Sequence, residues 1–333
     1  MYATLQEALQ FKGHDGAQSI IDECMNVCPE VTGIDKYNNG RTIPMDFGTE
    51  EKDTMETMFM TKVPEVNPFR DANTGVLPIK GEFEKRLTQL ATATAFWRAD
   101  LAVIEKNPKA GAQLILYRAI ASMKAHIEAL GKQFFYGQKN GGYGEGFPGI
   151  TELMDASQIV SANGKGNKLT SAYFVWFHED GVSWRYGMNG AMTMSEPREC
   201  TLQDAKGGLF PGIEQYMQYY PGLKVSHKYS VGRIANIDLT SVYAGKPDPN
   251  AFTDTHLYQY LMRLPAGMRP NVCFLPYAAA FLLAASRATV QFAQNASGDK
   301  IIVAGQTPPV TEFEGILLVP SDSIVIGEKE VKI

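Results

Sequence analysis

The sequence predicts a mixed α+β fold, and three observations support this fold class. A long apolar stripe at helical spacing runs from Pro108 to Phe135. A block of strand-like segments, separated by turn residues, occupies residues 171–238. A parallel α/β sheet would require strands and helices to alternate regularly, and the sequence shows no such alternation. At 333 residues, the chain is long enough for one large domain or for two to three smaller ones.

The first part of the chain combines a short helix with a long extended segment. Residues 15–29 place their apolar side chains on one helical face, with Asp15 as the N-cap and Pro29 near the end. Residues 41–95 have the pattern of two strand-like arms around a tip rich in Pro, Gly and Asn. Because this segment has so little core-forming pattern, we expect a projecting hairpin whose apolar residues need a partner surface.

The strongest helix is predicted between Pro108 and Phe135, with Gly137 just after its end. At 1.5 Å per residue it is on the order of 40 Å long, more than an average globular helix. Basic residues between 98 and 139 outnumber acidic ones, which fits either a solvated face or a mild phosphate-facing surface. Apolar residues recur at spacings of four and three, and we expect them to hold this helix to a sheet: Leu116, Ile120, Met123, Ile127, Leu130 and Phe134.

Two hairpins are predicted in the strand block, each with two strand-like runs around a turn dipeptide. They are residues 173–177 and 182–188 around Asp180-Gly181, and residues 213–220 and 223–239 around Pro221-Gly222. Gly232 marks a candidate β-bulge in the second hairpin. Beyond Asp238, the pattern predicts a helix at 253–264, a buried strand at 271–275, a helix at 277–294, and strands at 313–319 and 323–333.

Composition and charge exclude several classes of protein. The longest apolar stretch, Val272–Ala285, is interrupted by Pro276 and is shorter than the roughly 18 to 20 residues that span a bilayer. No apolar core follows a basic lead at the N-terminus, so we expect no secretory signal and a cytoplasmic chain. Its four sparse cysteines are then expected to be thiols. A net charge of −5 without a long basic run argues against a dedicated sequence-specific nucleic-acid binder.

No catalytic, cofactor-binding or metal-binding residue is predicted. His14, Cys24 and Cys28 have the chemistry of metal ligands, but their spacing is more typical of packing residues on one helix face. The motif HED at 178–180 lies on a predicted turn, where polar residues are common. The glycines of 141–149 are not followed by the Gly-Lys-Ser/Thr of a phosphate-binding loop. An enzyme that uses Asp or Glu alone stays open, although the sequence nominates no pair of carboxylates.

Four blocks of sequence occur in an order that resembles the major capsid proteins of tailed double-stranded DNA bacteriophages. They are the basic-faced helix ending in FFYG (134–137), the Gly-rich loop with FPGI (147–150), the stretch 200–239, and FEGILLVPSDSI (313–324). The last two blocks resemble the capsid proteins of short-tailed, podovirus-like phages. Over roughly residues 100–325, the chain is therefore similar to proteins with the Hong Kong 97 capsid fold.

The resemblance implies a division of the chain into four parts. They are an N-terminal arm (1–43), an extended E-loop hairpin (44–94), a peripheral domain with the spine helix at 108–135 (95–240), and an axial domain with the closing strands (241–333). The strand block precedes the helix–strand–helix block, the reverse of the family's usual order. We therefore expect a permuted connection between the peripheral and axial domains.

The resemblance also implies a function. Such a protein is a non-enzymatic subunit that assembles with copies of itself into hexamers and pentamers of an icosahedral virion shell. The shell is assembled in the host cytoplasm and encloses the phage double-stranded DNA genome with only non-specific contact. Decoration or cement, scaffold and portal proteins are the other candidate partners, and no cofactor, metal ion or membrane is expected.

The low charge of the chain fits this implied function. Only 20% of the residues are charged, below the roughly 25% of an average soluble domain, as expected where neighbouring subunits cover part of the surface. Two alternatives stay open. One is the shell protein of an encapsulin-like nanocompartment, which has the same fold class; the other is a cytoplasmic α+β enzyme that uses Asp/Glu chemistry.

Overall fold

The computed structural model describes residues 28–35, 40–52, 54–62, 82–106, 108–138, 146–187, 193–203, 206–245, 248, 250–265, 267–287, 291–294, 300–303 and 311–332. The predicted helix at 15–29 lies outside this part of the chain except for its last two positions. The tip of the predicted hairpin and most of the Gly-rich loop also lie outside it.

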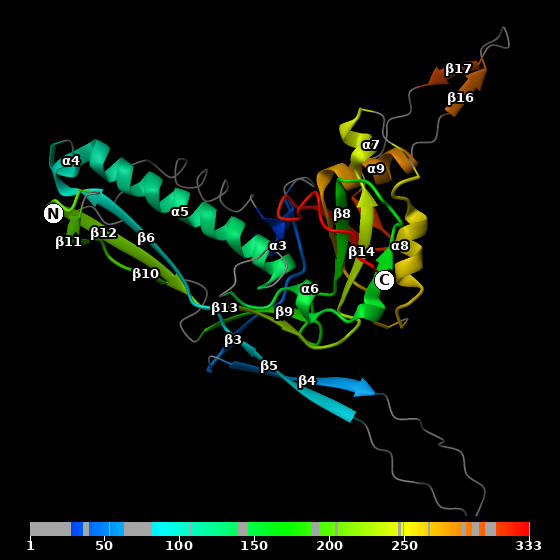
Figure 1. The fold of residues 1–333 in the computed structure, drawn as a ribbon, viewed down its shortest axis with the longest axis horizontal. Coiled ribbons are helices and arrows are strands. Elements are labelled where there is room, and N and C mark those ends of the chain that lie inside the picture. Colours follow the sequence, from blue (N-terminus) through cyan, green and yellow to red (C-terminus); the bar gives the residue numbers. More distant parts are fainter. Residues whose placement is uncertain are drawn as a thin grey trace, which may run out of the picture.

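A long helix and an antiparallel sheet form an elongated lobe (Figure 1). The helix, α5 (Pro108–Tyr136), confirms the predicted one, and Gly137 ends it with a φ of 62°. In the sheet, the central strand β12 (Leu209–Tyr219) pairs with β6 (Ala93–Asp100) along one edge. Along the other edge it pairs with β10 (Thr193–Met194) and β11 (Arg198–Gln203). A short helix, α4 (Leu101–Lys106), connects β6 to α5.

A six-stranded mixed sheet forms the second lobe (Figure 1). In spatial order, its strands are β18 (Glu312–Phe313), β19 (Ile316–Pro320), β15 (Val272–Leu275), β8 (Leu169–Val175), β14 (Val231–Asp238) and β7 (Ile159–Ser161). The predicted strand at 271–275 is confirmed. The single strand predicted at 313–319 is wrong in its first half: Glu314 and Gly315, the latter with a φ of 82°, form the turn of a small hairpin between β18 and β19. The predicted domain boundary at residue 240 falls between β14 and β15, which both pair with β8.

Two apolar cores lie on opposite faces of this sheet, and β8 contributes to both because its side chains alternate. Tyr173 and Val175 belong to the first core, and Ala172 and Phe174 to the second. The first core joins the two lobes: it contains Phe134 of α5, Trp97 of β6, Trp184 of β9 (Val182–Gly187) and Phe274 of β15. The second core lies under α8 (Asp254–Leu261) and α9 (Tyr277–Arg287).

Both predicted hairpins of the strand block are wrong, because their strands belong to different sheets. After Asp180-Gly181, β9 does not continue the sheet of β8 but pairs with β13 (Pro221–Val225) and with β3 (Phe47–Glu50). This route buries Trp184 completely against Phe134. Pro221-Gly222 begins β13 instead of forming a turn. At both predicted turns, the chain therefore passes from one sheet to another instead of folding back as a hairpin within one sheet.

Gly232 is not at a bulge, since the register of β14 shifts between Ile234 and Ile237. The glycine is needed for another reason: a Cβ at this position would lie 2.1 Å from the ring of Tyr260 in α8. The phenol ring stacks on Phe174 of β8 with 4.3 Å between the ring centroids. Gly232 therefore makes room for the helix that covers the second core.

The C-terminal part differs from its prediction in two further places. The predicted helix at 277–294 ends at Arg287, and β16 (Gln291–Gln294) pairs with β17 (Lys300–Val303). The last predicted strand, 323–333, is not a strand: Gly327 has a φ of 98°, which breaks the extended backbone. The remaining short elements are α3 (Pro29–Thr32), β1 (Ile34–Asp35), β2 (Arg41–Thr42), α6 (Ile150–Leu153), a 3-10 turn (Ala156–Gln158) and α7 (Thr240–Tyr243).

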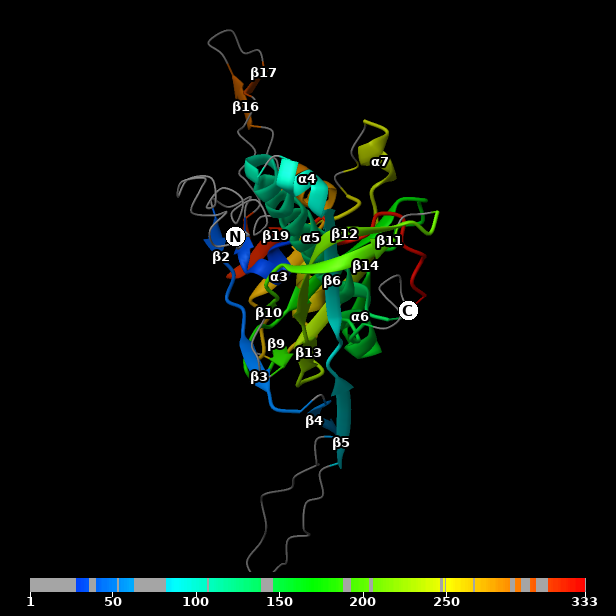
Figure 2. The same ribbon diagram turned by 90° about the vertical axis from the view of Figure 1, so that its left-hand side faces the viewer.

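A two-stranded hairpin projects from the base of the molecule (Figures 1 and 2). Its antiparallel arms are β4 (Thr54–Lys62) and β5 (Glu82–Gln89), as the sequence predicts. At the root of the hairpin, Met55 and Leu90 are buried against Gly222. Among the helices of the described residues, none is long and apolar enough to cross a membrane.

Candidate assembly surfaces

The projecting hairpin exposes apolar and charged side chains that the rest of the subunit does not cover. Leu87 of β5 is 63% exposed, and Phe47, in the neighbouring strand β3, is 52% exposed. Lys85 and Glu56 form a cross-strand ion pair of 2.8 Å in which both side chains are about half exposed. An isolated two-stranded hairpin is marginally stable in water, so contacts with another molecule would stabilise this one.

A second surface lies on the face of β6 and β12 that points away from the first core. Along β6, Trp97 is buried, whereas Phe96 and Arg98 are exposed. Glu214 of β12 is bound by Arg98 and, from β11, by Arg198, each at 2.6 Å. Hydrogen bonds from Arg198 and Arg98 lower the pKa of the Glu214 carboxyl. Two guanidinium groups share one carboxylate, so this cluster of three side chains carries one net positive charge.

The six residues of the predicted helix stripe lie at different depths. Leu130 and Phe134 are buried in the first core, and Met123 packs against it partly buried. Ile120 and Ile127 are half-buried, and the side chain of Leu116 lies outside the described part of the chain. On the same helix, Arg118, Glu128 and Lys132 are exposed.

Beside this stripe, an open cavity of about 400 Å³ lies between α5 and the segment that joins β5 to β6. Alanines 91, 93, 125 and 129 line it together with a polar pair, in which His126 Nδ1 lies 2.9 Å from the hydroxyl of Tyr219. Burial lowers the pKa of His126, which favours the neutral imidazole.

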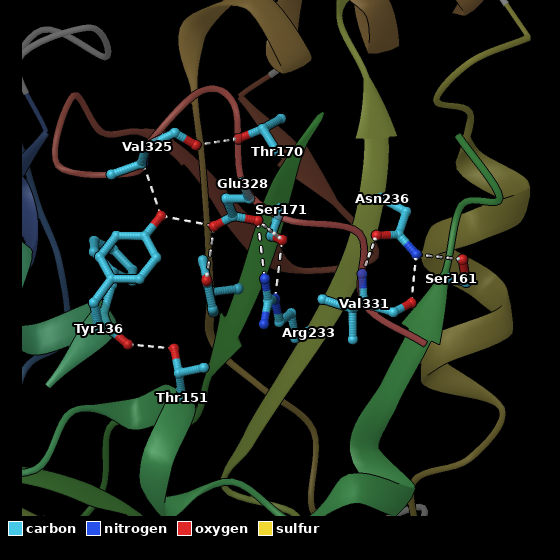
Figure 3. Close-up of polar contacts among 12 residues, drawn as sticks. Tyr136, Thr151, Ser161, Thr170, Ser171, Arg233, Asn236, Val325, Glu328 and Val331 are labelled. Atoms are coloured by element: carbon cyan, nitrogen blue, oxygen red, sulfur yellow. Dashed lines mark hydrogen bonds and ion pairs between the residues drawn. The ribbon is translucent and has the colours of Figure 1, made fainter. Parts of the chain in front are cut away.

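The C-terminal segment, residues 321–332, crosses two inner strands of the six-stranded sheet, β8 and β14, and bonds to both repeatedly (Figure 3). Glu328 is its central residue, with a side chain only 7% exposed. Its Oε2 accepts from Arg233 Nη2 at 2.9 Å and from the hydroxyl of Ser171. Its Oε1 accepts from the hydroxyls of Tyr136 at 2.7 Å and Tyr173 at 3.2 Å.

Burial sets the protonation of the groups around Glu328. It raises the pKa of both phenols, so Tyr136 and Tyr173 keep the protons that they donate. Arg233 is 9% exposed at its side chain and its pKa is raised, although burial itself acts in the opposite direction. Arg233 is therefore an ionised guanidinium, and a buried charge of this kind needs the Glu328 partner and further hydrogen bonds such as these.

A second buried carboxyl, Glu30 of α3, has no cation beside it among the described residues. Its Oε2 accepts from the Ser321 hydroxyl at 2.9 Å, while its Oε1 has no hydrogen-bond partner. Burial raises its pKa. A Cβ at Gly131 of α5 would lie 2.4 Å from this Oε1, so the glycine lets the helix approach the carboxyl closely.

The residues weighed in the sequence as metal ligands or reactive groups are described only in part. The described residues contain no group of three or more His, Cys, Asp and Glu side chains placed to hold a metal ion. His14 and Cys24 lie outside these residues, and Cys28 is a buried thiol whose pKa is raised to about 12, mainly by burial. His178 and Asp180 lie on an exposed turn, 3.8 Å apart.

The sequence pattern did not predict the polar groups that bind the C-terminal segment. Arg233 is the clearest missed signal, because it is a charged residue within a strand, β14, that is buried over almost its whole length. A buried arginine requires an acidic partner, but nothing in the sequence pattern points to Glu328, 95 residues away.

The chain is similar to a known protein family and to known structures. The family model described as Major capsid protein GP7 matches residues 44–332, and a search of curated proteins finds no match. Among solved structures, bacteriophage Epsilon15 matches with a TM-score of 0.60 and 16% identity over 85% of this chain and 87% of that chain. The bacteriophage JBD30 capsid matches with a TM-score of 0.49 and 10% identity over 90% and 92%.

The likeness to the Epsilon15 structure shows the fold, which is of the Hong Kong 97 capsid type, as the resemblance implied. The family match covers the projecting hairpin, both lobes and the C-terminal segment together. The chain therefore belongs to the Major capsid protein GP7 family and is a structural subunit of a phage capsid shell.

Proposed function

We propose that copies of this subunit assemble in the host cytoplasm into the hexamers and pentamers of an icosahedral shell, which encloses the double-stranded DNA genome of a short-tailed phage. The observation that carries this proposal is the hairpin β4–β5, which extends away from the subunit with its root in the core (Figure 2). A long hairpin of this kind is stable in a closed assembly, where it lies across a neighbouring subunit.

Closed symmetry would multiply such contacts. Every subunit both offers a hairpin and receives one, so individually weak contacts form together and stabilise the shell as a set. In this proposal, the E-loop is residues 44–94, the peripheral domain 95–240 and the axial domain 241–333. The half-buried residues of the α5 stripe, Ile120 and Ile127, would pack further when neighbours are present.

The charge of the chain supports a role as a container for DNA. A net charge of −5 over 333 residues provides no strongly basic wall that would bind the phosphates and resist packaging or release. The role needs no catalytic residue. Scaffold, portal and decoration proteins would be partners of the assembled shell, and each would bind a surface that the subunits leave open.

A shortened hairpin tests the proposal. Thr57 and Arg86 face each other across the two arms, so residues 58–85 can be replaced by an Asn-Gly turn that keeps both strands in register. This variant retains Met55 and Leu90 at the root. We expect the wild-type protein to form closed shells in electron micrographs, and the variant to stay unassembled while its far-ultraviolet circular dichroism spectrum keeps the helical bands.

Two results would contradict the proposal. One is a wild-type protein that stays monomeric under all assembly conditions. The other is a shortened variant that forms shells as well as the wild type does, because the hairpin would then be dispensable.

A further inference from the structure

We propose that the C-terminal segment fixes the orientation of α5 relative to the six-stranded sheet through the Glu328 carboxylate, and thereby sets the curvature of the shell. This inference rests on the proposed function, because a shell is one of its readouts. It assigns a positioning role in assembly to residues that are buried inside the subunit.

The first step is to identify the elements that contain the hydrogen-bond partners of Glu328. Tyr136 is the last residue of α5, whereas Ser171 and Tyr173 belong to β8 and Arg233 belongs to β14. One carboxylate therefore joins the end of the long helix to two neighbouring strands of the other lobe (Figure 3). Arg233 also donates from Nε to the Ser171 hydroxyl at 2.9 Å, which connects the two strands directly.

The backbone of the segment makes the same connection. The N–H of Val325 donates to the Tyr136 hydroxyl at 2.7 Å, and the carbonyl oxygen of Val325 accepts from the Thr170 hydroxyl at 3.1 Å. The N–H groups of Gly327 and Glu328 donate to the carbonyl oxygen of Leu169, at 2.8 and 2.9 Å. The segment thus lies between α5 and β8 and bonds to both.

The second step is why polar bonds are needed beside an apolar core. Phe134 and Phe135 already pack against the sheet, but apolar contact has little directionality and permits small rotations of the helix. A buried network of hydrogen bonds is directional, and each bond left unmade inside the protein is costly. The network at Glu328 therefore selects one orientation among those that the apolar core allows.

The third step is the length of α5, which determines how far a small tilt displaces its other end. α5 has 29 residues and its C-terminal end lies at the Glu328 network. At 1.5 Å per residue the helix is about 40 Å long, so a tilt of about 5° at this end moves the far end by roughly 3–4 Å. In a closed shell such a shift is repeated in every subunit, so it changes the radius of the shell or prevents closure.

Two substitutions weaken the network in different ways, and two controls accompany them. Glu328→Gln keeps the shape but removes the charge that Arg233 requires, and Tyr136→Phe removes one hydroxyl while the ion pair remains. Glu330→Gln changes an exposed carboxylate in the same segment. Leu282→Ala creates a cavity in the second core, remote from the network, and serves as a control for lost stability alone.

The readouts are hydrogen exchange of residues 325–331 in the full-length chain and the diameters of shells in electron micrographs. For Glu328→Gln we expect exchange at least tenfold faster and shells with a shifted or broadened diameter; Tyr136→Phe should change both in the same direction but less. Glu330→Gln should match the wild type, and Leu282→Ala should lower the denaturation midpoint while its shells keep the wild-type diameter.

The inference is overturned if Glu328→Gln or, where that variant does not fold, Tyr136→Phe forms shells with the wild-type diameter distribution. It is also overturned if exchange of residues 325–331 is unchanged in both variants. If the wild-type protein forms no shells, the proposed function fails, and hydrogen exchange alone then decides whether Glu328 fixes the segment to the sheet.

Discussion

Two extended segments of this protein differ in what covers them. The hairpin β4–β5 and the C-terminal segment both lack a core of their own. The hairpin is held at its root, where Met55 and Leu90 are buried, whereas the C-terminal segment is bonded along its length to α5, β8 and β14. The C-terminal segment is thus covered by its own chain, and the contrast supports the proposal that another subunit covers the hairpin.

Among the described residues, each segment takes part in one ion pair, and the two pairs offer the sharpest test of this comparison. Arg233–Glu328 is 2.9 Å long and buried; Lys85–Glu56 is 2.8 Å long and about half exposed. Arg233→Met would leave Glu328 as an uncompensated buried charge, so we expect a loss of about 3–5 kcal/mol in the free energy of unfolding. Lys85→Met should have no measurable effect on folding, because water and salt screen an exposed pair.

Chemical denaturation of the unassembled proteins measures both effects. Equal losses for Arg233→Met and Lys85→Met would contradict the assignment of one segment to the subunit's interior and of the other to its surface.

The next largest effect is expected in the second core, where the close contact of Gly232 with Tyr260 leaves no room for a methyl group. Gly232→Ala should lower the free energy of unfolding by about 1–3 kcal/mol, since overpacking forces neighbouring groups to move. Gly267→Ala is the matched control, because a Cβ there would meet nothing within 4 Å. If both variants have wild-type stability, the packing of α8 on β14 is looser than the structure shows.

The buried carboxyl of Glu30 predicts a dependence of stability on pH. Its pKa is raised above the ordinary value of 4.5, so the folded protein binds this proton more tightly than the unfolded chain does. The resulting stabilisation is present at pH below 4.5 and is lost as the pH rises through the folded pKa. Glu30→Gln should therefore flatten this decline, which urea denaturation midpoints between pH 4.5 and 8.5 would measure. Glu330→Gln serves as the exposed control, and an unchanged slope in Glu30→Gln would contradict the assignment.

The smallest effect on folding is expected on the hairpin itself. Leu87 is 63% exposed, so Leu87→Ser should change the free energy of unfolding by less than about 0.5 kcal/mol. If the hairpin contacts a neighbouring subunit, the same variant should reduce the yield of shells, measured by sedimentation. A wild-type yield would show that this side chain lies outside the contact.

Local pattern was sufficient for the elements that depend on nearby residues. The stripe from Leu116 to Phe134 and the glycine at position 137 predict α5, and the turn-rich segment at 41–95 predicts the projecting hairpin. The two wrong hairpins show where local pattern fails. Asp180-Gly181 does form a turn, but the burial of Trp184 directs the following strand into another sheet. Burial of this kind depends on residues far away in the sequence.

Of the candidate functional regions, likewise, one could be predicted from local sequence and another could not. The hairpin could be predicted because a segment without a core is visible in the sequence itself. The network around Glu328 could not, since it joins positions 136, 171, 233 and 328, and only the fold brings them together. Capsid function came from the resemblance of several sequence blocks, and the match over residues 44–332 confirms it.

The central claim is that the hairpin β4–β5 is covered by another subunit in the shell. Electron cryomicroscopy of assembled wild-type particles tests this most directly. We expect density for the hairpin of one subunit to lie against its neighbour, with Leu87 buried between the two. A hairpin that extends into solvent, or that folds back on its own subunit, would contradict the account.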